Sequence, residues 1–196
     1  YSAFFTESFI DEVAHATGRD PLRFRLDLLK SHPRHRAVLE LACSKAGWGT
    51  SLGTGRARGL ALHESFGSIV AQVVEVSLVG KAPRVHRVVC AIDCGVAVNP
   101  DIVMQQMEGG IVFGLTAALF GEITIEHGRV QQTSFAQYPM ALLRDCPAIE
   151  THIVASTEPP GGVGETGVPP IAPAIANALF ALTGRRLRAL PLRLSE

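Results

Sequence analysis

The sequence lacks any excess of charge and any long hydrophobic run. Its 18 Lys and Arg residues balance 18 Asp and Glu residues, so the formal net charge is zero. Nucleic-acid-binding domains carry a basic surface, so we expect no nucleic-acid partner. No run of about 18 apolar residues occurs, so we expect no membrane span. A signal peptide is not visible, and the chain begins at Tyr1 rather than Met, so we expect a piece of a longer protein.

The sequence also offers little that could hold a metal ion through side chains. Its four cysteines form no C-x-x-C pair and stand at Cys43, Cys90, Cys94 and Cys146. Zinc and iron–sulfur sites need Cys or His ligands clustered at short spacings. We therefore expect four small, buried, hydrophobic cysteines, no disulfide framework and no side-chain metal site.

What is present is a 47% hydrophobic composition over 196 residues, which suits a globular protein with a buried core. The local patterns predict helices at 3–17, 20–29, 35–46, 99–120 and 172–184, and strands at 57–65, 69–92 (a hairpin), 121–133 (a second hairpin), 149–156 and 186–192. Helices and strands do not alternate regularly in this order. The sequence therefore favours an α+β fold of mixed helices and antiparallel hairpins over a doubly wound parallel sheet.

The sequence pattern changes from helical to strand-like on either side of residues 49–59, which suggests that the chain has three parts. Residues 1–48 are predicted to be a helical segment, and the glycine-rich stretch GTSLGTGRARG at 49–59 a linker. Residues 60–196 are predicted to form an α+β domain that contains the hairpins.

The stretch EPPGGVGETG, residues 158–167, is the most unusual segment of the chain. Its glycines at 162, 164 and 167 form the G-x-G-x-x-G pattern of dinucleotide-binding loops. However, prolines lie on both sides, so a helix cannot begin at the third glycine as that fingerprint requires. The acid expected about 20 residues further on, which would bind a ribose, is also missing. A nicotinamide dehydrogenase is therefore the least favoured interpretation.

Glu165 stands in the centre of this loop. The neighbouring glycines allow positive φ angles and the close approach of a bulky group, while the prolines stiffen the loop. A carboxylate held in this way before a helix could serve as a general base. The local pattern fits a surface glutamate in a turn equally well, so both interpretations stay open at this point.

Several other polar residues are interpreted as structural. Asp93 and Asn99 fit a turn and a helix cap. The arginines within 185–193 fit a solvated edge or a partner contact. His63, Glu64 and Ser65 have the residue types of a catalytic triad, but neighbours on a strand point to opposite faces, which argues against nucleophilic catalysis there.

Three segments together resemble one family. GGVGETGVPPIAPAIANALF resembles the glutamate loop and following helix of the molybdenum hydroxylases, the xanthine dehydrogenase and aldehyde oxidase superfamily. VVCAIDCGVAVNPDIVMQQMEGGIVFGLTAALFGEI resembles that family's Asp-x-Gly-x-x-x-Asn-Pro segment and Gln-x-x-Gly helix. FFTESFIDEVAHATGRDPLRFRLDLL resembles the helix after its substrate-pocket loop. The short linker at 49–59 resembles the isoquinoline 1-oxidoreductase β-subunit branch.

The resemblance implies part of the cofactor-binding domain of a molybdopterin-dependent oxidoreductase. Glu165 matches the family's general base, which acts as a water-derived oxygen attacks an isoquinoline-like N-heterocycle or an aldehyde and hydride passes to molybdenum. Gln106 matches a glutamine that hydrogen-bonds the cofactor. Gly162 and Gly164 match positions where the backbone lets the cofactor approach, and the helix glycines at 109 and 110 fit the same role.

The implied cofactor is molybdenum–molybdopterin, in its cytosine dinucleotide form. Its dithiolene supplies sulfur ligands to the metal, so the protein supplies binding, orientation and electrostatics. The resemblance also implies [2Fe–2S] clusters on an iron–sulfur partner subunit. The location stays unknown, with bacterial cytoplasm and periplasm both open. The family's upstream cofactor loops are missing from this chain. We therefore expect it to need the remainder of its parent chain and to be inactive alone. The alternative is a non-catalytic cofactor-binding or assembly domain of the same fold.

Overall fold

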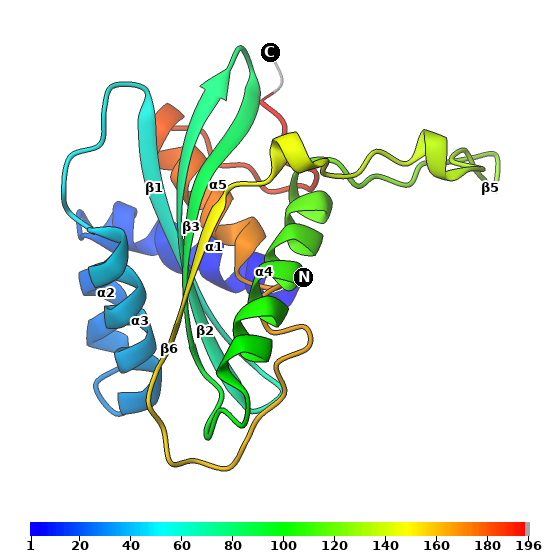
Figure 1. The fold of residues 1–196 in the computed structure, drawn as a ribbon. Coiled ribbons are helices and arrows are strands. Elements are labelled where there is room, and N and C mark those ends of the chain that lie inside the picture. The colour runs from blue at the N-terminus through cyan, green and yellow to red at the C-terminus, as the bar shows by residue number, and fades with distance from the viewer. Residues whose placement is uncertain (195–196) are drawn as a thin grey trace.

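The structure, a computed structural model, describes residues 1–194. The helices are α1 (Ser2–Ala16), α2 (Pro21–Leu28), α3 (Pro33–Ala46), α4 (Pro100–Leu119) and α5 (Ile171–Thr183). The strands are β1 (Arg56–Ser65), β2 (Ser68–Val79), β3 (Ala82–Asp93), β4 (Ile125–Glu126), β5 (Arg129–Val130) and β6 (Ala148–Ile153). Figure 1 shows helices on both sides of one twisted sheet, which confirms the predicted α+β class.

Capping residues set the ends of the helices where the sequence predicted them. The Asp20 side chain accepts a hydrogen bond at the start of α2, and the Asn99 side chain accepts one from the Ile102 amide at the start of α4. Gly47 and Gly184 end α3 and α5 with φ angles of 65° and 71°. This left-handed conformation is open to glycine without a steric cost.

The main sheet has the strand order β1-β2-β3-β6. The first three strands form an antiparallel meander, whereas β6 pairs parallel to β3. The sequence predicted antiparallel hairpins and a separate strand at 149–156, but not this parallel pair. The parallel pair arises because α4 and a long loop carry the chain back across the sheet between β3 and β6, and such a crossover is what parallel strands require. The first strand begins at Arg56, inside the range 49–59 that was expected to be a linker, and Arg56 already pairs with Ser77.

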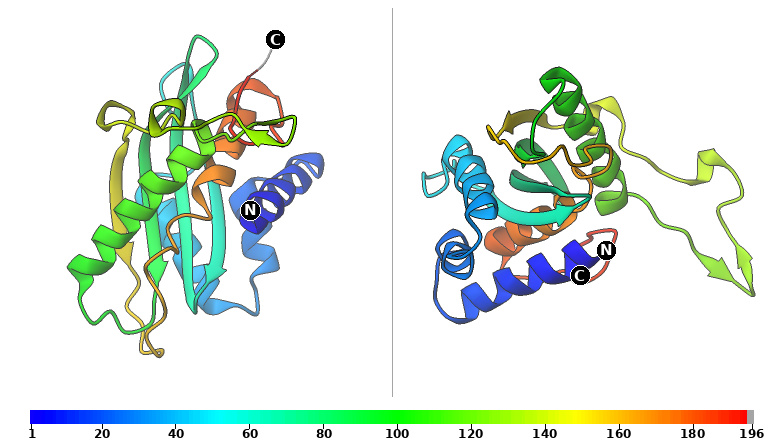
Figure 2. Two further views of the ribbon diagram at one scale, coloured as in Figure 1. Left: turned by 90° about the vertical axis from the view of Figure 1, so that its right-hand side faces the viewer. Right: turned by 90° about the horizontal axis from the view of Figure 1, so that it is seen from below.

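Two buried clusters lie on the two faces of the sheet. On one face α2 and α3 pack against the strands through residues that include Leu26, Val38 and Leu39. On the other face α4 and α5 pack on the sheet, and α1 lies against α5 (Figure 2). The division into a helical segment, a linker and a domain stays a prediction, but α2 and α3 share their core with the sheet.

The C-terminal segment does not form the strand predicted at 186–192. The arginines of this segment instead make ion pairs that run back to the first helix. Arg186 Nη1 lies 2.6 Å from Asp11 Oδ2, and Arg188 Nη2 lies 2.6 Å from Glu12 Oε1. The expected solvated edge was therefore wrong for Arg186, whose side chain is only 12% exposed.

Within the segment that joins α4 to β6, the part that contains β4 and β5 projects away from the body of the molecule (Figures 1 and 2). The hairpin predicted there is present but short, since β4 and β5 pair over two residues each. The preceding helix, α4, is the one helix within residues 1–194 whose length and composition suit a membrane crossing. This is weak evidence for a span, because core helices meet the same measure and Met107, Ile111 and Leu115 of α4 are buried against the sheet.

Candidate functional site

The glutamate loop, residues 158–170, is tied to the end of the sheet by backbone hydrogen bonds. The Gly161 amide donates to the Cys94 carbonyl at 2.8 Å, and the Gly162 amide donates to the Phe66 carbonyl at 2.8 Å. The first bond joins the loop to the end of β3, and the second joins it to the turn between β1 and β2. The loop is therefore positioned by two separate parts of the sheet.

A buried side chain holds the far end of the loop. Gln72 of β2 is fully buried, and its Nε2 donates to the Gly167 carbonyl at 2.7 Å. The Val168 amide donates to the Glu165 carbonyl at 3.0 Å and closes a turn around the glutamate. Sequence reasoning missed Gln72, although a single amide within the apolar strand SIVAQVVEV was an available signal, because a buried polar group needs a partner.

The loop glycines matter because they carry no side chain, and not because their backbone angles are unusual. None of those at 161, 162, 164 and 167 has a positive φ, so that expectation was wrong. A Cβ added at Gly161, Gly162 or Gly167 would lie between 2.5 and 3.0 Å from a neighbouring protein atom. At Gly164 nothing lies within 4 Å. Three glycines therefore let the loop pack on the protein, and Gly164 leaves open space.

The glycines of α4 also fall into two groups, those packed against a neighbouring element and one that faces open space. A Cβ at Gly114 would meet Ile171 Cγ2 at 2.5 Å, and one at Gly110 would meet Gly167 Cα at 3.4 Å. These two positions let α4 lie against the glutamate loop. At Gly109 a Cβ would meet nothing within 4 Å.

A cavity of about 770 Å³ lies where the loop, α4 and the β1–β2 turn meet. It is lined from the loop by Gly164, Glu165, Val168 and Pro169, from α4 by Gln106, Gly109, Gly110 and Phe113, and from elsewhere by Tyr1, Ser65 and Phe66. The cavity thus brings together Glu165, Gln106 and Gly164 of the predicted site. Gly162 does not line it, and packs against Phe66 instead.

The polar groups of the cavity have unused hydrogen-bonding capacity. Glu165 and Gln106 are both exposed, and no hydrogen bond or ion pair engages either side chain within residues 1–194. Ser65 also lines the cavity, but its Oγ is buried and has no hydrogen-bond partner among the described residues. Exposure alone would suit a surface glutamate, but an unpaired carboxylate and an unpaired amide that line one cavity are the polar groups that a ligand site needs.

The sequence disfavours both a side-chain metal site and a dinucleotide-binding loop. Among the described residues no group of three or more His, Cys, Asp or Glu side chains could hold a metal ion. Cys43, Cys90 and Cys94 are buried as predicted, and burial raises the pKa of the Cys43 and Cys90 thiols to about 12. The prediction was wrong for Cys146, which is only partly buried because it lies in the loop before β6. Within residues 1–194 no strand follows α5, so the glycine loop does not lie in the βαβ unit that a dinucleotide fingerprint needs.

The residues interpreted as structural do have structural partners. Asp93 accepts two hydrogen bonds from the Arg34 guanidinium, at 2.8 and 2.9 Å, and one from the Gly95 amide. These bonds hold the pKa of the Asp93 carboxyl below its usual value. Glu64 Oε2 lies 2.8 Å from Nε2 of His35, a residue of another element, so the adjacent His63 has no triad geometry with it.

Comparison with known proteins gives a consistent result. The family model for the molybdopterin cofactor-binding domain matches residues 46–147, a range that includes Gln106 but ends before Glu165. Isoquinoline 1-oxidoreductase subunit beta from Brevundimonas diminuta is 38% identical over 97% of this chain and 25% of its own length. The membrane-bound aldehyde dehydrogenase [pyrroloquinoline-quinone] of Gluconacetobacter polyoxogenes is 32% identical over 98% of this chain and 28% of its own length.

Solved structures show the same fold. Quinoline 2-oxidoreductase from Pseudomonas putida 86 superposes with a TM-score of 0.56 and 25% identity, over 63% of this chain and 17% of its own. The chain therefore spans about a quarter of the length of the two curated relatives above, and less of this solved structure.

Proposed function

This chain belongs to the molybdopterin cofactor-binding domain family, and we propose that it supplies the general base and part of the cofactor bed of a molybdenum hydroxylase. The observation that carries the proposal is the single cavity shared by Glu165, Gln106 and Gly164. The proposed substrate is an electron-poor N-heterocycle or an aldehyde. The names of the two curated relatives support both classes, so the choice between them stays open.

The residues around the cavity fit a pterin cofactor. The volume of about 770 Å³ is ample for a bulky planar group. A Cβ added at Gly109 or Gly164 would meet no atom within 4 Å, so both positions leave space for a ligand. When bound, the cofactor would supply the metal, its sulfur ligands and the acceptor for the substrate's two electrons. We propose the cytosine dinucleotide form, as the family resemblance implies.

The side chains have separate roles in this proposal. Glu165 takes up the proton as a water-derived oxygen attacks the electron-poor carbon of the substrate. Its carboxylate has no protein partner within residues 1–194, so it does not have to break an ion pair first. Gln106 hydrogen-bonds the cofactor through its amide. Gly162 acts indirectly, because it lets the loop lie against Phe66.

The activity is proposed for a full-length subunit. The chain spans about a quarter of the two curated relatives, so most of the site's other walls would come from the remainder of a longer polypeptide. An iron–sulfur partner subunit with [2Fe–2S] clusters would remove the electrons.

Replacing Glu165 by Gln in the full-length subunit tests the proposal. The amide keeps the shape of the side chain but cannot take a proton, so kcat should fall by about 10²–10⁴-fold. Metal analysis should show unchanged molybdenum content, because the carboxylate is not a proposed metal ligand. Glu158→Gln is the matched control, since Glu158 is an exposed acid in the same loop but outside the cavity, and its kcat should stay at the parent value.

Turnover of Glu165→Gln within a few-fold of the parent, at equal molybdenum loading, would exclude the general-base role. A full-length subunit that carries no molybdenum after expression with the cofactor pathway would favour the non-catalytic assembly role instead.

A further inference from the structure

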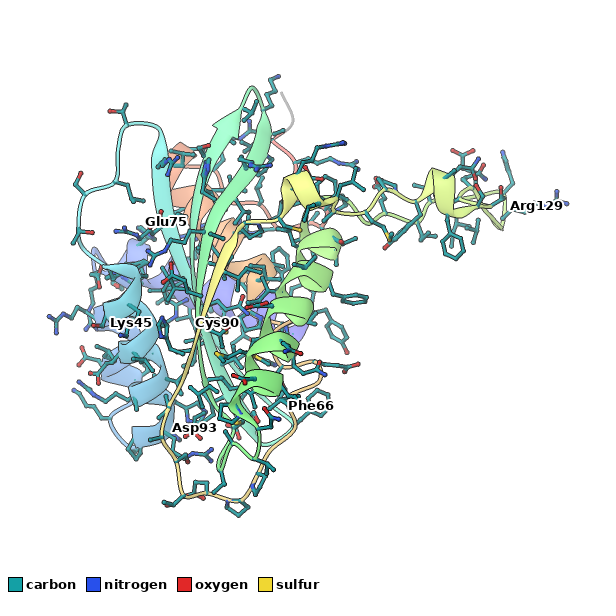
Figure 3. The ribbon with its side chains drawn as sticks, in the orientation of Figure 1. Lys45, Phe66, Glu75, Cys90, Asp93 and Arg129 are labelled. Carbon is teal, nitrogen blue, oxygen red and sulfur yellow. The ribbon has the colours of Figure 1, made fainter. Side chains whose placement is uncertain are left out.

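Gln72 is a polar residue in an apolar part of the sheet. It lies on β2 directly opposite Cys90 of β3, which Figure 3 labels near the middle of the sheet. Its neighbours on the same face of β2, Val70 and Val74, belong to the buried cluster that the sheet shares with α4 and α5. Gln72 itself is fully buried. A buried amide lowers stability unless its polar atoms are paired, so packing alone does not explain this residue.

The amide of Gln72 is paired with the glutamate loop. Its Nε2 donates to the Gly167 carbonyl at 2.7 Å, whereas its Oε1 is buried and has no hydrogen-bond partner within residues 1–194. The residue therefore keeps an unpaired oxygen in the core for the sake of a bond to a distant segment. A strand that needed only a well-packed interior would be more stable with an apolar side chain there.

Gly167 is held between β2 and α4. A Cβ added at Gly167 would lie 3.0 Å from the Met107 carbonyl oxygen of α4, and one added at Gly110 would lie 3.4 Å from Gly167 Cα. The backbone of α4 thus limits the movement of Gly167 on one side, and the Gln72 hydrogen bond fixes it on the other.

This clamp lies next to Glu165 in the chain. Thr166 is 1% exposed, whereas Glu165 is exposed on the wall of the cavity. The Val168 amide donates to the Glu165 carbonyl, so the position of Gly167 determines where the turn that carries the glutamate lies. On the other side of Glu165, a Cβ added at Gly164 would meet no atom within 4 Å. The loop is therefore fixed on the C-terminal side of Glu165 and has room on the N-terminal side.

We propose that Gln72 is a positioning residue for the reaction. It does not line the cavity, but its bond to the Gly167 carbonyl holds the Glu165 carboxylate at the place from which it takes up the proton. General-base catalysis depends on this placement, because a shift of about 1 Å can lower a rate by about 10²-fold. The inference rests on the proposed function and adds to it a residue outside the cavity.

Gln72→Met in the full-length subunit tests the inference. Methionine has a side chain of similar length but no N–H to donate. At equal molybdenum content kcat should fall by about ten- to hundredfold. KM should stay within about twofold of the parent value, because Gln72 does not line the cavity.

Val74→Ala is the matched control. It removes buried volume from the same face of β2 but removes no hydrogen bond. This variant should therefore melt at a lower temperature and keep the kcat of the parent. A parent-like kcat in Gln72→Met, or an equal loss of kcat in both variants, would overturn the inference.

A double-mutant cycle separates positioning from general damage. If Gln72 acts through Glu165, then Gln72→Met should change the residual kcat of Glu165→Gln by less than about twofold. A residue that only supports the fold would lower kcat by the same factor in both backgrounds, and that result would contradict the positioning role.

Hydrogen exchange gives a second readout that needs no turnover. Loss of the Gln72 bond leaves the Gly167 carbonyl unpaired, so the exchange rate of the Val168 amide in the full-length subunit should rise by at least about fivefold. Val74→Ala should leave this rate unchanged. An unchanged rate in Gln72→Met, or a loss of molybdenum that accounts for its loss of turnover, would overturn the inference.

The two hypotheses can fail separately. Turnover of Glu165→Gln close to the parent value would remove the general base, whatever the Val168 amide shows. A large loss of turnover in Glu165→Gln together with parent-like turnover in Gln72→Met would keep the general base and exclude Gln72 as its positioning residue.

Discussion

The buried acids of α1 and β3 differ sharply from the acid of the glutamate loop. Glu7 and Asp11 are 5% and 2% exposed, Asp93 is 2% exposed, and each pairs with an arginine. Glu165 is exposed on the wall of a cavity and has no partner among residues 1–194. A buried charge must be compensated to be tolerated, whereas a base must be accessible and uncommitted. The pattern of pairing therefore separates the acids that hold the fold from the acid that could do chemistry.

The paired acids also explain how the two ends of the chain meet. Arg25 of α2 donates to a Glu7 carboxylate oxygen and to the Glu7 carbonyl, and Arg186 reaches Asp11 from beyond α5. The Arg186 guanidinium lies 3.4 Å from the centre of the Phe180 ring. These contacts join α1, α2 and the C-terminal segment, and none of them involves a residue that lines the cavity.

Arg25 is the most buried arginine of this network, so replacing it should lower the free energy of unfolding the most. Arg25→Met leaves Glu7 buried without its partner, and breaking one side of a buried pair costs about 3–5 kcal/mol. Urea denaturation of the chain measures the change. Arg19→Met is the control, because the Arg19–Asp27 pair is exposed and such pairs contribute about 0–1 kcal/mol. Equal losses in both variants would show that burial does not distinguish the pairs.

The contribution of Asp93 to folding stability should depend on pH. The Arg34 guanidinium holds the pKa of the Asp93 carboxyl below the unfolded value of 3.8. Its contribution to stability is therefore fully present above about pH 4 and is lost as the pH falls through the folded pKa. Asp93→Asn should cost about 1.5–3 kcal/mol at pH 7, the range for hydrogen bonds to charged groups. The difference from the parent should shrink between pH 4 and pH 2 in urea titrations, and a difference independent of pH would contradict this assignment.

Substitutions at two glycines of α4 should have different effects, on stability at Gly114 and on cofactor binding at Gly109. Gly114→Ala would place a Cβ 2.5 Å from Ile171 Cγ2, and overpacking of this kind costs about 1–3 kcal/mol. Gly109→Ala meets no atom within 4 Å, so it should be neutral or stabilise α4 by up to about 1 kcal/mol. Molybdenum content of the full-length Gly109→Ala subunit should nevertheless fall, because the new methyl group enters the cavity. Thermal unfolding and metal analysis give the two results independently.

Much of the fold was predictable because its signals are local. Asp20 and Asn99 cap the helices that follow them, and the hairpin over 69–92 follows from alternation and a turn. The strand predicted at 186–192 was wrong because its arginines are held by α1, a contact across almost the whole chain that no local pattern shows. The parallel pairing of β6 was missed for the same reason.

The candidate site was predictable only in part. Glu165 and Gln106 were identified through the family resemblance, and the structure adds that they share a cavity. The positive φ of Phe66 could not be foreseen, because its type argues against that conformation. Gln72 was visible as a lone amide in a strand, but its partner, the Gly167 carbonyl, depends on how the loop folds back onto the sheet.

Gln106 should show the smallest effect, because the proposed contact is one neutral hydrogen bond. Such a bond contributes about 0.5–1.5 kcal/mol, which is roughly a two- to twelvefold change in cofactor affinity. Gln106→Ala in the full-length subunit should therefore lower molybdenum occupancy or activity partially and leave unfolding unchanged, since its side chain is exposed.

Gln105→Ala is the matched control for this prediction. It removes the same side chain from the adjacent exposed position on α4, which lies outside the cavity. Occupancy is measured as molybdenum per subunit after dialysis, a condition in which a small difference in affinity becomes visible. An occupancy and activity equal to the parent would remove Gln106 from the site, and equal losses in both variants would show that α4 itself, rather than the Gln106 amide, had been disturbed. A partial loss in Gln106→Ala alone would place the α4 wall in contact with the cofactor and leave the acid chemistry to Glu165.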